Sequence, residues 1–284
     1  MAGARKVSRS VGGNLFVFAV LLVTAIFMVF PLVYSISASL KPLNELWIFP
    51  PRFFVQNPTA KNFKDLLSLM SDSWVPFSRY IFNTVLITAV GTAGHILLSS
   101  MCAFSICKLK FPGHNAVFRM VVYSLMFSTA VTAIPGFLVI NLFGMVNTYW
   151  ALLLPAFASS LGLYLMKQFM ESMIPDSLLE AARIDGAGDP HLFFRIVMPI
   201  VRPAWLTLLL FSFQHLWNVG STPLIQSESL KTLNYAISQI VTGGIARAGT
   251  ASAATVVMMA VPIAVFVFTQ SNVVETMATS GMKG

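Results

Sequence analysis

Charged side chains gather in one short stretch of this chain, LLEAARIDGAGDPHLFFRIVMP, which covers residues 178–199. Carboxylates can transfer protons or bind metal ions, and carboxylates and guanidinium groups can both form ion pairs with a partner. No Ser/His/Asp arrangement is evident, and the four histidines show none of the spacings of metal ligands. This stretch therefore shows neither the pattern of a catalytic site nor that of a metal site. Its charged residues are Glu180, Arg183, Asp185, Asp189 and Arg195.

A phosphate-binding loop for ATP is missing from the sequence. Such a loop has the pattern G-x-x-x-x-G-K-[ST], in which backbone N–H groups and a lysine hold the phosphates. The glycine-rich segment GGIARAGTAS, residues 243–252, has no lysine before its threonine. We therefore predict a chain without catalytic residues, cofactor or metal ion of its own. Any energy for work must then come from a partner.

The composition predicts an integral membrane protein. Of the 284 residues, 56% are hydrophobic and only 10% are charged, against roughly 25% charged residues in soluble domains. The net charge of +8 comes from basic residues spread between apolar segments, without interleaved aromatic residues. We interpret them as signals of membrane orientation and not as a nucleic-acid surface. Cys102 and Cys107 lack metal-site partners and are expected to be small buried thiols.

Six apolar stretches reach the length of about 20 residues that a membrane-spanning helix needs. They are too long for strands and lack the alternation of a membrane barrel. The sequence therefore predicts an all-α integral membrane protein with six transmembrane helices. The expected spans are 14–36, 80–106, 116–140, 149–168, 201–220 and 251–270.

The first span follows the basic sequence MAGARKVSRS and is too long for the core of a secretory signal, so we expect it to stay uncleaved. Residues 1–13 are then a cytoplasmic tail, and residues 14–284 form one transmembrane domain. Basic residues also lie between spans two and three and between spans four and five, whereas the 141–148 loop has no charge. This pattern places both termini and the 175–199 loop in the cytoplasm. The 41–79 segment is basic too, but long outer loops follow the charge rule less strictly.

Local signals divide the 175–199 loop into two short helices. Ser177 and Glu180 have the spacing of a capping box, and Gly186 stands where a left-handed residue would end the first helix. Asp189 before Pro190 predicts the start of a second helix, which should end at Pro199. Such a loop could lie on the lipid surface, or it could dock a soluble partner.

A longer pattern in this loop favours docking. Glu180-Ala181-Ala182 is followed by Gly186, then by Ile196 and by Met198-Pro199. This pattern resembles the EAA motif in permease subunits of binding-protein-dependent ABC importers, although the family has leucine where Met198 stands. LKPLNELWIFPPRFFVQNPTAKNF, CKLKFPG, FGMVNTYWALLLP and FQHLWN are similar to the sugar-importing branch. The resemblance covers most of residues 30 to 284 and is closest to the smaller, six-span, maltose-type permease.

The resemblance implies a transport subunit in the cytoplasmic membrane of a bacterium or archaeon. Its expected partners are a second homologous permease, two ATPase subunits that use ATP and magnesium, and an external solute-binding protein. The cargo would be a carbohydrate, with a polyol or a glycerophosphodiester as the alternative. The residues implied in coupling to the ATPase are Glu180, Ala181, Ala182, Arg183, Asp185, Gly186, Ile196 and Pro199.

Polar residues inside the spans are candidates for a substrate path, because they are costly in lipid. Amide groups suit sugar hydroxyls and an aromatic face suits the C–H side of a sugar; Trp217 equally suits the aromatic belt of a membrane protein. The candidates are Asn83, Gln214, Trp217 and Asn218.

Other residues of the spans point to helix packing. We expect His95 to form a hydrogen bond to another helix, Gly91 and Gly94 to permit close helix contacts, and Pro135 to kink span three. The spans contain essentially no Asp or Glu, which argues against an ion-coupled secondary transporter. A membrane scaffold would not need the glycine-hinged loop.

Overall fold

The computed structural model describes residues 11–71, 75–109, 111–244 and 247–280, and every regular element in these ranges is a helix. This confirms the all-α expectation. The chain divides into two compact units. One unit comprises Met1–Asp72 with Ile240–Met258, and the other comprises Ser73–Gln239 with Met259–Gly284.

The first unit contains α1 (Val11–Ser39), α2 (Leu43–Leu46) and α3 (Lys61–Ser71). The segment after α1 was expected as a long outer loop, but it folds around two buried polar side chains. Glu45 accepts hydrogen bonds from the backbone N–H groups of Gln56 and Asn57, at 2.7 and 3.3 Å. Asn62 donates to the carbonyls of Ser39 and Lys41, at 2.8 and 2.7 Å. These bonds tie the segment to the end of α1.

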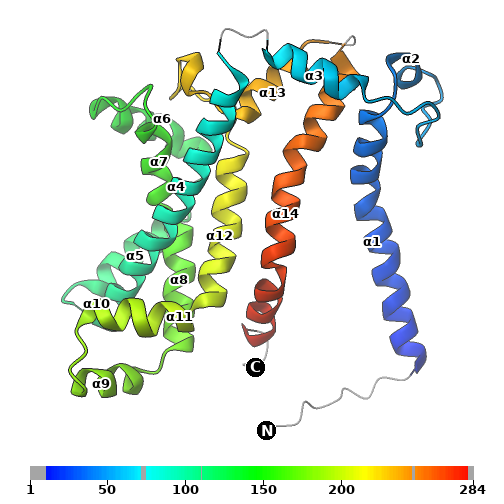
Figure 1. The fold of residues 1–284 in the computed structure, drawn as a ribbon. Coiled ribbons are helices and arrows are strands. Elements are labelled where there is room, and N and C mark those ends of the chain that lie inside the picture. The colour runs from blue at the N-terminus through cyan, green and yellow to red at the C-terminus, as the bar shows by residue number, and fades with distance from the viewer. Residues whose placement is uncertain (1–10, 72–74, 110, 245–246, 281–284) are drawn as a thin grey trace. The chain divides into compact units, whose positions relative to one another are not determined.

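The second unit is a bundle in which α4 (Phe77–Phe104) packs against three other helices (Figure 1). These are α7 (Trp150–Phe157), α8 (Ser160–Met173) and α12 (Arg202–Trp217). A short π-helix, η1 (Ser105–Leu109), extends α4. The bundle also contains α5 (His114–Ser124), α6 (Thr129–Leu142) and a 3-10 turn, η3 (Glu228–Leu230). Helices α13 (Leu233–Val241) and α14 (Ala248–Ser280) contain residues of both units.

Glycines bring the bundle helices close together, as expected for Gly91 and Gly94. A Cβ atom on Gly91 would lie 2.5 Å from the side chain of Leu216, and one on Gly94 would overlap the ring of Phe157. Gly162 on α8 is equally crowded, because a Cβ there would overlap the His95 ring. Since real Cβ atoms do not approach so closely, a larger residue at any of these three positions requires the facing side chain or its helix to shift.

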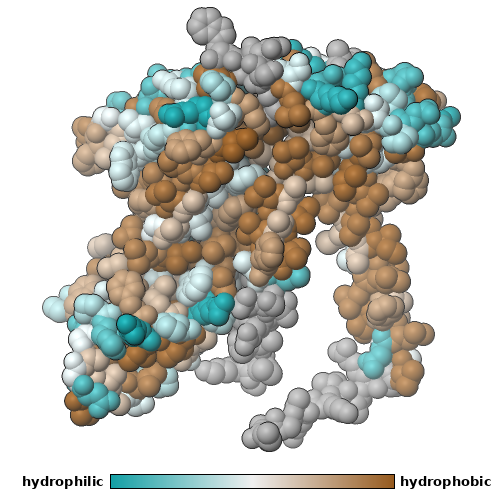
Figure 2. All heavy atoms as spheres, viewed as in Figure 1, coloured by the Kyte–Doolittle hydropathy of each residue, from teal (hydrophilic) through white to brown (hydrophobic). Residues whose placement is uncertain are grey.

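Four helices are long and apolar enough to cross a membrane. They match the predicted spans 14–36, 80–106, 149–168 and 251–270. The helical ranges are Val11–Ser39, Phe77–Leu109, Trp150–Met173 and Ala248–Gln270. In the bundle, apolar residues cover the middle and polar residues gather at the end that carries residues 176–191 (Figure 2).

The predicted third span, 116–140, is not one straight helix. Helices α5 and α6 meet at an angle of 115°, so the span is broken. The break lies at residues 125–128, where three successive N–H groups bond to carbonyls only three residues back and Ser128 takes an extended conformation. Pro135 lies inside α6 and not at this break, so a kink at Pro135 itself stays a prediction.

The predicted fifth span, 201–220, is the 16-residue helix α12. It joins the preceding helical segment, Asp189–Ile200, at an angle of 79°. Pro199 was expected to end that segment, but the helix continues to Ile200 and breaks at Val201. Pro203 then occupies the first turn of α12, where its missing N–H needs no partner.

Candidate functional site

The charged stretch forms two helices joined at Gly186 (Figure 1). The first is α9 (Asp176–Ile184). Gly186 follows with a φ of 86°, and its N–H donates to the carbonyl of Arg183 at 3.0 Å. The predicted left-handed end of this helix is therefore confirmed. The second helix comprises α10 (Asp189–His191), the π-helix η2 (Leu192–Val197) and α11 (Met198–Ile200).

Both predicted side-chain caps are wrong. Helix α9 begins one residue before Ser177, with Pro175 in the capping position and no side-chain cap, so Ser177 and Glu180 do not form the box. Gly188 precedes the second helix, again without a side-chain cap. The Asp189 carboxylate instead accepts a hydrogen bond from Arg183 at 3.1 Å. This ion pair joins the two helices across the glycine turn.

Buried apolar side chains fix both helices to the bundle. Leu179 of α9 is 3% exposed, and Phe193 of η2 packs its ring 5.6 Å from that of Phe104. One hydrophobic cluster contains these residues together with side chains of α8 and α12. The loop is therefore a structured extension of the bundle and not a free amphipathic segment. Other members of the cluster are Cys107, Met166, Met170, Ile174, Leu192, Val197, Val201, Ala204 and Leu208.

The outer face of α9 has no partner within the described residues. Glu180 and Asp185 are exposed and make no hydrogen bond or ion pair there, and Ile184 is 86% exposed. An open hollow lies beside this face, between α9 and the second helix. The structure thus brings Ala182, Asp185, Gly186 and Ile196 together around one hollow, which Ala187, Gly188 and His191 complete. Pro199 lies at the far end of the second helix.

Lys108 at the end of η1 is a contact that sequence reasoning missed. Its side chain is only 5% exposed, and its ammonium donates to the carbonyl of Ile174 at 2.6 Å and to the Asp176 carboxylate at 2.7 Å. These residues end α8 and begin α9. A lysine that directly follows the buried Cys107 was the available signal, because a lysine is seldom buried without a partner.

Asn83 is fully buried near the start of α4, and both the NH2 group and the oxygen of its side-chain amide form hydrogen bonds. It donates to the carbonyls of Ser229 and Lys231, at 2.9 and 2.8 Å, and it accepts from the hydroxyl of Tyr149 at 2.7 Å. Next to it, Thr84 accepts a hydrogen bond from the N–H of Leu233 at 2.8 Å. These bonds hold the 229–233 segment against α4. A substrate contact by Asn83 stays a prediction and would require some of them to break.

The other three path candidates lie at the end of α12. Trp217 is buried and its ring stacks on Phe213 at 5.5 Å, whereas Gln214 and Asn218 are exposed. Trp217 and Phe213 line a groove of about 480 Å³ between α4, α12 and residues of α14. The remaining lining residues are Val85, Thr88, Ala89, Thr92, Ala93, Ile96, Leu209, Val261 and Val265. This lining is largely aliphatic and does not include Gln214 or Asn218, so it suits packing of Trp217 better than a sugar contact.

His95 does not form the expected hydrogen bond to another helix. Its Nε2 atom is buried and has no hydrogen-bond partner among the described residues. The same is true of the hydroxyls of Thr88 and Thr92 on the same helix. The ring packs instead against Gly162 of α8. His95 therefore contributes to the contact between α4 and α8 through packing.

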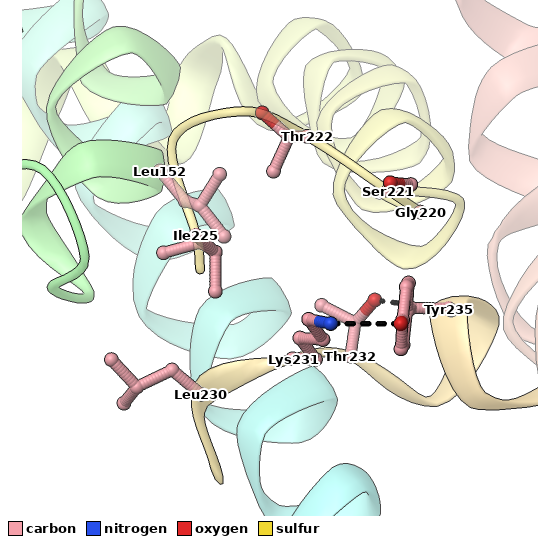
Figure 3. Close-up of a pocket in the computed structure, with 9 residues that line it drawn as sticks. All are labelled: Leu152, Gly220, Ser221, Thr222, Ile225, Leu230, Lys231, Thr232 and Tyr235. Carbon is pink, nitrogen blue, oxygen red and sulfur yellow. Dashed lines mark hydrogen bonds between the residues drawn. The ribbon is translucent and has the colours of Figure 1, made fainter. Parts of the chain in front are cut away.

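A small cavity lies where the 220–232 segment meets α7 and α13 (Figure 3). Its volume of about 10 Å³ has room for one water molecule, which excludes a sugar. The Lys231 ammonium at its edge bonds to the Tyr235 hydroxyl and the Glu228 carboxylate, each at 2.7 Å. Burial lowers the pKa of Lys231, but these two hydrogen bonds outweigh it and the net shift is upward. Lys231 therefore stays charged at neutral pH.

Comparison with known proteins identifies the family. The family described as "binding-protein-dependent transport system inner membrane component" matches residues 95–278. The polygalacturonan/rhamnogalacturonan transport system permease protein YtcP of Bacillus subtilis (strain 168) is 32% identical over 222 residues, which are 75% of this chain and 71% of YtcP. The sn-glycerol-3-phosphate transport system permease protein UgpE of Rhizobium meliloti (strain 1021) is 34% identical over 216 residues, 75% of this chain and 76% of UgpE.

The fold has a close structural counterpart. A crystal structure of a bacterial ABC transporter that imports the acidic polysaccharide alginate superposes with a TM-score of 0.79 at 21% identity, over 94% of this chain and 99% of that one. The chain therefore belongs to the family of binding-protein-dependent transport system inner membrane components, the permeases of ABC importers. It is a multi-pass membrane protein that takes part in transport without catalysing a reaction. This confirms the family resemblance of the 180–199 stretch.

Proposed function

We propose that this chain is one permease subunit of an ATP-driven importer for carbohydrate, and that α9 is its contact with a separate ATPase. The observation that supports this role most directly is the outer face of α9. The buried side of α9 is fixed to the bundle through Leu179. On the outer face, Glu180, Asp185 and the exposed Ile184 have no partner among the described residues. A rigidly held helix with an unused charged and apolar face suits docking to another protein.

The proposed assembly has six spans in this subunit, with both termini and the 175–199 loop in the cytoplasm. A second homologous permease would complete the translocation path. Two ATPase subunits would bind ATP and magnesium, and α9 would dock on one of them. A solute-binding protein would deliver the cargo from outside, in keeping with the binding-protein dependence of the family. The membrane would be the cytoplasmic membrane of a bacterium or archaeon.

Carbohydrate is the cargo that the relatives support best. YtcP is named for polygalacturonan and rhamnogalacturonan, and the structural counterpart imports alginate. Within this chain, Gln214 and Asn218 would offer amide groups and Trp217 an aromatic face to such a cargo. The similarity to UgpE supports a phosphate ester of glycerol as a second candidate. Ligand binding by the cognate solute-binding protein separates the two: tight binding of an oligosaccharide supports the first, and binding of glycerol phosphates alone contradicts it.

The docking role predicts that Glu180→Lys will remove the ATPase from the complex. A reversed charge in a partly dehydrated interface should cost about 2–5 kcal/mol of binding free energy. The measurement is the amount of ATPase that co-purifies with the tagged permease, together with substrate uptake. Glu171→Lys is a suitable control, because Glu171 is an exposed residue of α8 that pairs with Lys167 of its own helix. Equal ATPase recovery with wild type and Glu180→Lys would contradict the proposal.

A further inference from the structure

Lys108 joins three helices at one point of the bundle. Its ammonium bonds to Ile174, the last residue before the proline that links α8 to α9, and to Asp176, the first residue of α9. Lys108 itself belongs to the continuation of α4. The end of α8, the start of α9 and the end of α4 therefore meet at one charged group.

The burial of Lys108 shows that the contact is specific. Taking an ammonium out of water is costly unless hydrogen bonds compensate for the lost hydration. A position needed only for packing would be filled by leucine or methionine at no such cost. Asp176, by contrast, is about half exposed and stands at a helix N-terminus, where a carboxylate is stable without a cation. The ion pair thus serves to hold Lys108 at this junction.

We propose that Lys108 is a positioning residue that locks the start of α9 to α4, so that a movement of α9 at the ATPase also moves α4. This inference rests on the proposed function of α9. Along the chain, only Ile174 and Pro175 separate α8 from α9, and a two-residue link could act as a pivot. The Lys108 bonds add a polar attachment at the pivot to the apolar packing of Leu179 further along α9. The attached helix is the one that packs against α7, α8 and α12 and holds the 229–233 segment at its other end.

The test uses the complete importer, reconstituted in vesicles with its own ATPase and binding protein. Lys108→Met keeps the unbranched chain up to the ε position and removes the ammonium group with its donors. We expect the ATPase to remain bound and to hydrolyse ATP, while the amount of substrate transported per ATP falls by about tenfold or more, because each of the two lost charge-assisted hydrogen bonds is worth roughly that factor. Lys108→Arg restores donors and charge and should recover most of this ratio, which a simple loss of packing would not predict.

Two further variants keep the outcomes separate. Asp176→Asn removes the ion pair at a half-exposed position, so it should fold even if Lys108→Met does not, and it should lower the transport ratio by a smaller factor. An unchanged ratio in Lys108→Met, or in Asp176→Asn where Lys108→Met does not fold, overturns the proposal. Glu180→Lys should instead lose the ATPase altogether. A wild-type complex without any ATPase would contradict the proposed function of α9 itself. This outcome differs from a failure of the Lys108 proposal, in which the ATPase is bound but the transport ratio is unchanged.

Discussion

Single residues in this chain act mainly by holding backbone segments in place. Asn83 and Lys108 are both buried, and both bond to backbone carbonyls of other segments. Gly186 was predicted from the sequence because only glycine readily takes a positive φ where a helix ends. Asn83 was selected because it is polar, but nothing in the sequence shows which carbonyls it meets. These two carbonyls lie 146 and 148 residues away in the chain, at a position that only the fold determines.

Asn83→Leu separates a structural from a substrate role. The change leaves two carbonyls and the Tyr149 hydroxyl without this partner, so the free energy of unfolding should fall by about 1–3 kcal/mol. A thermal unfolding curve of the purified protein in detergent measures this loss. Asn218→Ala is the control for the unfolding temperature alone, because Asn218 is exposed and its side-chain amide bonds only within its own helix turn, but it is itself a candidate path residue. An unchanged unfolding temperature with weakened substrate uptake would support the substrate role instead.

Gly186 offers a test of the glycine turn without a steric complication. No atom lies within 4 Å of a Cβ built there, so a larger residue suffers only from the positive φ. Gly186→Val should cost about 1–2 kcal/mol in this backbone conformation and should reduce ATPase recovery with the permease. Gly186→Asn tolerates the conformation better and should retain more ATPase. Equal recovery from both variants would mean that the turn does not set the docking angle.

At the scale of helices, packing was more predictable than helix ends. The apolar stretches located the long helices, and the close contacts of Gly91 and Gly94 followed from small residues inside a span. The break at residues 125–128 was missed because it contains neither glycine nor proline. The false capping box shows a related problem. The cap falls on Pro175 instead of Ser177, so α9 begins two residues earlier than predicted and Ser177 lies inside its first turn.

Gly162→Ala tests the contact between α8 and α4. The added methyl group would overlap the His95 ring, and forcing it into a packed core typically costs about 1–3 kcal/mol. We expect a lower unfolding temperature and reduced yield of folded protein. Gly136→Ala in α6 is the matched control, since no atom lies within 4 Å of a Cβ at that position. Similar unfolding temperatures for the two variants would show that α8 and α4 can separate freely.

For the whole molecule, family and fold class were accessible from the sequence, whereas the division into two compact units was not. The units combine segments from distant parts of the chain, and hydropathy alone does not report such pairings. Because α5 and α6 meet at 115°, neither their combined length nor their composition shows that they cross the membrane as one span. At 1.5 Å per residue, α6 measures about 21 Å, short of the roughly 30 Å of hydrocarbon that a span must cross.

Cysteine labelling tests the six-span arrangement. In a cysteine-free background, Leu142→Cys at the end of α6 should react with a membrane-impermeant maleimide in intact cells, because the 141–148 loop is expected outside. Ile184→Cys on α9 should react only after the cells are opened, in a strain without the ATPase. Both positions are largely exposed, at 82% and 86%, so burial does not confuse the result. Labelling of Ile184→Cys in intact cells would contradict the cytoplasmic position of α9.

The π-helix at residues 105–109 has a consequence for the rotational phase of α4. A π turn holds one residue more than an α turn, and each residue of an α-helix advances the chain by about 100° around the axis. Deleting Ile106 would let the turn close as an ordinary α-helix. Every later side chain would then be rotated by about that angle, and Lys108 would point away from Asp176 although its chemistry is unchanged. The one extra residue of the π turn thus sets the rotation of the helix that brings Lys108 to the start of α9.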